Sequence, residues 1–148
     1  LFQGIKDNLD DHETRISTAE NAVNVSREIS FPISGNYSLN GVRVGAGYYK
    51  LISDIAVQAV KIHQFKAYTS GTTEFDVLYK RGVGSFTSIF SVRPTVTSAN
   101  GDFYTSNNGT IVTQDLLVDD IIRVDITAVQ TGGFETHSIT LTIEYEVA

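Results

Sequence analysis

The sequence contains no cysteine, which excludes disulfides, thiol catalysis and cysteine-ligated zinc or iron–sulfur sites. Tryptophan and methionine are also absent, and proline occurs only twice in 148 residues. No run of apolar residues approaches the roughly 20 that a helix needs to cross a bilayer, so membrane insertion is not expected. The lack of cysteine leaves the redox compartment open, because many exported bacterial proteins also lack it.

Positive charge is scarce as well. The chain has 11 Lys and Arg against 17 Asp and Glu, a formal net charge of −6, and neither half carries a basic patch. A nucleic-acid partner is therefore not expected, and neither is binding to anionic lipid. With 41% apolar residues, the chain is long enough for one globular domain plus a modest extra element.

The first four residues, 1–4, have the sequence Leu-Phe-Gln-Gly, which resembles the remnant of a viral-protease site used to remove purification tags. We leave them out of the fold prediction. Together with the absence of methionine, they predict that the natural protein begins far upstream and that this sequence is its C-terminal piece.

Residues 5–27 are predicted to form a coiled-coil stalk. Core-type residues recur at alternating intervals of four and three, as in a heptad repeat: Ile5, Leu9, His12, Ile16, Ala19 and Val23. The stretch from Arg15 to Glu20 resembles a trimer-specifying pattern, in which the Arg packs over the core and pairs with the Glu of a neighbouring helix. His12 is interpreted as a polar core residue that sets register. A solvated helix with a chance charge pair is the alternative.

Residues 28–148 are predicted to form an antiparallel β-sandwich head, jelly-roll-like, because β-branched and aromatic residues alternate with polar ones between recurrent turns. The expected strands are 29–33, 42–44, 48–52, 56–68, 75–79, 86–92, 122–128 and 139–147. In the expected strand 56–68, the apolar residues change from one face to the other between Ile62 and Phe65. This break in the alternation predicts a bulge. The longest loop is expected at 97–110, and 130–136 is expected to be a hairpin loop.

No residue pattern points firmly to catalysis or to a cofactor. Glu144 and Glu146 would lie on one face of a strand, about 6.8 Å apart at Cα, near the spacing of paired-carboxylate glycosidases. Any surface strand with this alternation gives the same pair, so we predict no catalytic residue. Asp115, Asp119 and Asp120 lack the spacing of an EF-type calcium loop and suit a turn better, so no metal is predicted.

The long loop has the composition of a sugar-binding surface. It combines Phe103 and Tyr104 with the amides of Asn107 and Asn108, a mixture that can stack on sugar rings and bond their hydroxyls. Phe134, in the loop before the last strand, is the second expected contributor. In the alternative, the segment is a plain hairpin loop whose rings fold back over the sandwich.

A short trimeric coiled coil followed by a β head resembles the tip of a trimeric fibre, as in bacteriophage tail fibres and bacterial mosaic adhesive trimers. The likeness rests on Arg15, Ile16, Ala19 and Glu20 and, more loosely, on residues 88–94 and 118–126. It implies a homotrimer that binds a cell-surface polysaccharide or glycoprotein, located outside the cell, on its surface or in the periplasm, or in a phage virion. A glycan hydrolase or depolymerase and a structural trimerisation head without ligand are the alternative hypotheses.

Overall fold

The computed structural model describes residues 26–33, 42–132 and 139–148. Residues 5–25 of the predicted stalk (5–27) and Phe134 lie outside the described residues. Arg27, which was expected to end the stalk, is instead the first residue of a strand. None of the described segments forms a helix long and apolar enough to span a membrane.

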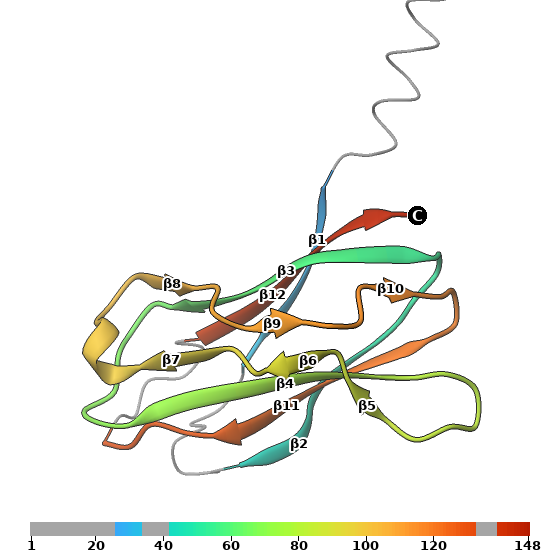
Figure 1. The fold of residues 1–148 in the computed structure, drawn as a ribbon. Coiled ribbons are helices and arrows are strands. Elements are labelled where there is room, and N and C mark those ends of the chain that lie inside the picture. Colours follow the sequence, from blue (N-terminus) through green and yellow to red (C-terminus); the bar gives the residue numbers. More distant parts are fainter. Residues whose placement is uncertain (1–25, 34–41, 133–138) are drawn as a thin grey trace, which may run out of the picture.

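The described residues form two five-stranded antiparallel sheets that face each other (Figure 1). Sheet A has the order β1-β12-β3-β10, with β8 also paired to β3, and contains β1 (Arg27–Pro32), β3 (Ile55–Gln64), β8 (Tyr104–Ser106), β10 (Asp115–Leu116) and β12 (Ile139–Val147). Sheet B has the order β2-β11-β4-β5, with β7 also paired to β4, and contains β2 (Arg43–Lys50), β4 (Thr72–Lys80), β5 (Thr87–Ser88), β7 (Thr95–Thr97) and β11 (Ile121–Ala128). The remaining elements are the pair β6 (Phe90–Val92) and β9 (Thr110–Ile111) and the short 3₁₀ helix η1 (Ser98–Asn100).

The pairing is nested, which is the arrangement of a jelly roll. The first strand pairs with the last (β1 with β12), the second with the next to last (β2 with β11), and β3 with β8 and β10. The innermost pairs join β4 to β5 and β7. The predicted fold class, a mainly β antiparallel sandwich of jelly-roll type, is therefore confirmed for the described residues.

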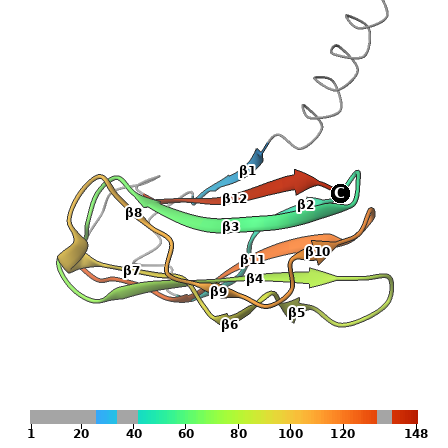
Figure 2. The same cartoon turned by 45° about the horizontal axis from the view of Figure 1, so that its top comes forward.

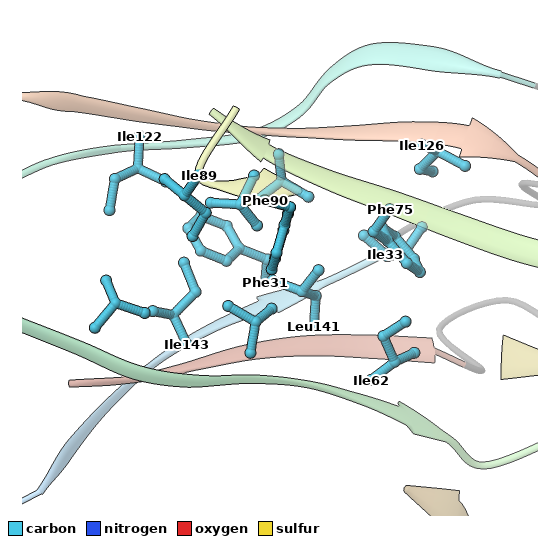
Figure 3. Close-up of a cluster of buried hydrophobic side chains, with 14 of the residues drawn as sticks. Phe31, Ile33, Ile62, Phe75, Ile89, Phe90, Ile122, Ile126, Leu141 and Ile143 are labelled. Atoms are coloured by element: carbon cyan, nitrogen blue, oxygen red, sulfur yellow. The ribbon is translucent and has the colours of Figure 1, made fainter. Parts of the chain in front are cut away.

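The core lies between the sheets because apolar residues alternate on the strands. Leu141 and Ile143 of β12 and Ile122 and Ile126 of β11 lie between the two sheets (Figure 3). All four are almost completely buried, as are Ile139 and Val124 of the same two strands. Gly47 lets the edge strands close over this core, since a Cβ at that position would lie 2.6 Å from Cδ1 of the Phe31 ring.

The two strands with the clearest alternation were predicted almost to the residue, but their connection was not. The segment 130–136 was expected to be a hairpin loop, yet β11 and β12 lie in different sheets. Alternation specifies which side chains are buried and says nothing about which strand lies alongside.

Three strand predictions need correction. The two strands expected at 42–44 and 48–52 form one strand, β2, which ends at Lys50. The N–H of Gly45 (φ +75°) bonds to Asp125 Oδ1 at 2.8 Å, and pairing to β11 continues on both sides of this irregularity. The expected single strand at 86–92 is divided into β5 and β6. The register shift in β3 falls at Gln58 and not between Ile62 and Phe65, where the strand ends.

The expected loop at 97–110 is largely structured. It contains η1 and then β8, which pairs with the end of β3 through Ser106 opposite Ile62 and Tyr104 opposite Gln64. The segment thus extends sheet A instead of leaving it. The sequence suggested a loop because turn residues dominate the segment and β8, with only three residues, is too short to show an alternating pattern.

The strand pairing defines two opposite ends of the sandwich. Arg27 pairs with Tyr145 and Val147 with Ile55, and we call this the proximal end. Ile139 pairs with Gln64 at the opposite, distal end, about 20 Å along β12 from Arg27. In Figures 1 and 2 the distal end carries β7, β8 and η1, away from the C-terminus.

Candidate functional site

A small hollow opens at the distal end, where β8 joins β3. Its volume is about 100 Å³. It is lined by His63, Gln64, Phe65, Phe103, Tyr104 and Thr105. We call this set of residues the distal pocket.

Three aromatic rings of the distal pocket are open to solvent. Phe103 is 84% exposed, Phe65 47% and Tyr104 40%. Large apolar side chains normally gain about 1.5 to 3 kcal/mol from burial, so three of them gathered at one exposed place indicate an interaction surface.

Phe103 is held in an unfavourable backbone conformation. Its φ is +54°, in the left-handed region that bulky side chains rarely adopt. The surrounding contacts enforce it, since the Phe103 N–H bonds to the Phe65 carbonyl at 3.4 Å and the Asp102 carboxylate accepts the Ala67 N–H at 2.8 Å. Strain of this kind, about 1 to 3 kcal/mol, concentrates at functional sites.

The pocket also offers polar groups. His63 Nδ1 and Thr105 Oγ1 are hydrogen-bonded at 3.0 Å, which fixes the imidazole on the outer face of sheet A. Within the described part of the chain, neither His63 Nε2 nor the Tyr104 hydroxyl has a hydrogen-bond partner. Both are therefore available to a ligand.

A buried network of neutral amides holds the residues behind the pocket in place. Gln64 Nε2 donates to the carbonyls of Thr97 (3.0 Å) and Gly101 (2.8 Å), and its Oε1 accepts from Gln130 Nε2 (2.7 Å). Gln130 Oε1 in turn accepts the Tyr68 N–H at 3.1 Å. Both glutamine side chains are buried, so this network fixes β3, η1 and the segment after β11 to one another.

The predicted binding residues divide into two groups. Phe103 and Tyr104 line the distal pocket together, whereas Asn107 and Asn108 do not. The Asn108 amide clamps Thr95 instead, accepting its N–H at 2.8 Å and donating to its Oγ1 at 3.0 Å. Asn107 is exposed.

Sequence reasoning missed Phe65 and His63 as site residues. They lie about 40 positions before Phe103 and Tyr104 and come beside them only through the pairing of β3 with β8. The break in alternation between Ile62 and Phe65 could have indicated Phe65, because it occurs where β3 ends and leaves the following aromatic side chain exposed.

Two of the acidic residues considered for chemistry, Glu144 and Asp120, have structural partners. Glu144 Oε1 accepts from Lys61 Nζ at 2.6 Å on the outer face of sheet A. Asp120 closes the turn before β11, accepting the Leu117 N–H at 2.8 Å and both Nε and Nη2 of Arg81 at 3.0 and 2.8 Å. The hydrogen bonds from Arg81 hold the pKa of the Asp120 carboxyl below its ordinary value, against the opposing effect of burial.

No protein-family model matches the sequence, and neither does any curated protein. Among solved structures, the capsid of Ralstonia phage GP4 is similar, with a TM-score of 0.52, 12% identity and coverage of 84% of each chain. Murine APRIL (TM-score 0.45, 15% identity, 83% of this chain and 100% of that one) and Eiger TNF from S. frugiperda (0.40, 9%, 83% and 85%) are more distant. The likeness to the phage capsid protein concerns the fold alone.

Proposed function

We propose that the chain is the C-terminal tip of a homotrimeric adhesive fibre and that the distal pocket binds a cell-surface glycan. The observation that carries the proposal is the cluster of Phe65, Phe103 and Tyr104, three exposed rings around one small hollow. Aromatic faces stack on the apolar faces of sugar rings, while nearby polar groups bond their hydroxyls. The distal pocket supplies both kinds of group.

The position of the pocket supports the fibre-tip hypothesis. The first strand starts at the proximal end with Arg27, so a stalk formed by the residues before it would leave from there and present the pocket outward. The heptad spacing together with the pattern from Arg15 to Glu20 favours three copies on one stalk. Three linked sites raise apparent affinity by roughly 10² or more over one site, which lets weak sites hold a cell surface.

Glycan binding of this kind requires no cofactor and no catalytic residue. The protein would act outside the cell, on its surface or in the periplasm, or in a phage virion, wherever its fibre is displayed. The bonding of Glu144 to Lys61 supports a structural role for that carboxylate. Hydrolysis of the glycan is therefore the less favoured hypothesis.

Binding of the intact chain to an array of surface glycans tests the proposal. Tyr104→Ala is expected to reduce binding while the melting temperature stays nearly unchanged. Tyr48→Ala is the matched control, because Tyr48 is also an exposed tyrosine, 60% accessible, but belongs to β2 of sheet B. Equal binding by the wild-type chain and Tyr104→Ala would refute the site, and release of oligosaccharide that Glu144→Gln abolishes would favour hydrolysis.

A further inference from the structure

The size of the distal pocket limits what it can enclose. Its volume of about 100 Å³ is well below the 300 to 1,000 Å³ typical of sites that surround a drug-sized ligand. The lining comes from only two short segments, the end of β3 and the beginning of β8. Its lining, as the described residues give it, is one compact cluster, which suits one sugar ring better than a chain of sugars.

The charge around the pocket limits the class of sugar. Among the described residues, its lining includes no Lys or Arg. The nearest cation in sequence, Lys66, has its Nζ 3.6 Å from the carboxylate of Asp102, the residue before Phe103. An acidic sugar would thus meet a carboxylate beside the site and the net charge of −6 of the whole chain.

From this size and charge we propose that the distal pocket takes a single uncharged pyranose at the end of a glycan, and that it excludes sialic and uronic acids. The inference rests on the proposed glycan-binding function. The exposed ring of Phe103 provides the stacking face, and the Tyr104 hydroxyl and His63 Nε2 bond the sugar hydroxyls. With so few contacts, one pocket binds with a dissociation constant in roughly the millimolar range.

The backbone strain at Phe103 supports its role in stacking. Asparagine adopts positive φ far more readily than phenylalanine does, so the local conformation alone would favour a polar residue there. Keeping an aromatic ring at this position costs stability and leaves the ring 84% exposed. That combination makes sense if the ring contacts a ligand.

Saturation-transfer NMR on the full chain, with single sugars as probes, tests the inference. The neutral probes are methyl glycosides of glucose, galactose, mannose and their N-acetylated amines, and the acidic probes are the methyl glycosides of N-acetylneuraminic acid and glucuronic acid. We expect at least one neutral probe to bind and the acidic probes to bind less or not at all. Phe103→Asn and Tyr104→Ala should each weaken that binding roughly two- to tenfold, whereas Tyr48→Ala should leave it unchanged.

The outcomes separate this inference from the proposed function. Tighter binding of an acidic probe, lost in Tyr104→Ala, would overturn the inference and leave glycan binding intact. Binding that requires an oligosaccharide, with no single sugar recognised, would overturn the claim of a one-ring terminal site. If no sugar of any length binds and Tyr104→Ala adheres to cells as the wild type does, both the inference and the proposed function fail.

Discussion

The two ends of the sandwich are closed by different chemistry. At the distal end, the neutral amides of Gln64 and Gln130 are buried and bond to each other and to backbone carbonyls. At the proximal end, the turn before β11 is closed by an ion pair, with Arg81 Nη2 2.8 Å from Asp120 Oδ2. Acid can weaken the ion pair of Arg81 and Asp120. The amides of Gln64 and Gln130 do not titrate, so the hydrogen bonds between them do not depend on pH.

The largest expected effect comes from removing the distal network. Gln130→Leu removes the buried hydrogen bonds from the Tyr68 N–H (3.1 Å) and to Gln64 Oε1 (2.7 Å), so the free energy of unfolding should fall by about 3 kcal/mol. Urea denaturation measures this change. Gln58→Leu is the control, since Gln58 is exposed and its side-chain hydrogen bond, to the Ala56 carbonyl, is long at 3.4 Å. A loss below about 1 kcal/mol in Gln130→Leu would show that the network is not what holds the distal end.

The next largest expected effect comes from disrupting assembly of the predicted stalk on the proximal side. Ile16→Asp would place three carboxylates in one layer of the predicted stalk, where burial and repulsion both oppose association. Light scattering should then give the mass of one 16.2 kDa chain, whereas the wild type should give about three times that value. Binding to a glycan-coated surface should weaken roughly 100-fold through lost avidity. A variant that stays trimeric would assign trimerisation to the head.

Acid sensitivity at the proximal end is a smaller effect. Because folding lowers the pKa of Asp120, its stabilising contribution is complete above the unfolded pKa of about 3.9 and is lost as the pH falls through the lower folded value. Asp120→Asn should lower the melting temperature by a few degrees at pH 7 and show a smaller decrease than the wild type on acidification below about pH 5. Asp115→Asn, at an exposed position, should behave as the wild type. Identical acid profiles for Asp120→Asn and the wild type would contradict the ion-pair account.

The smallest expected effect has the opposite sign. Phe103→Asn should raise the free energy of unfolding by about 1 kcal/mol or less, because asparagine tolerates a φ of +54°. Val83→Asn, at a fully exposed site in the turn after β4, should give no such gain. Urea denaturation of both variants provides the measurement, and a destabilised Phe103→Asn would assign the ring to packing.

Much of the fold could be predicted from alternation, and the rest depended on pairing. The strands at 122–128 and 139–147 were clear because one face of each is buried. Gln64 and Gln130 were not predicted to be buried, because a polar residue interrupts the apolar alternation and its hydrogen-bond partners cannot be read from the sequence. For the same reason Phe103 and Tyr104 could be nominated from one loop, while His63 and Phe65 required the pairing of β3 with β8.

The central claim is that the distal pocket is the glycan-binding site, and chemical-shift mapping tests it most directly. The intact ¹⁵N-labelled chain would be titrated with the neutral methyl glycoside that binds it. We predict that the backbone amides of residues 63–65 and 102–105 shift, while those of Ile52, Leu117 and Val118 near the proximal end do not. Shifts confined to the proximal end or to β2, with the distal pocket unperturbed, would contradict the account.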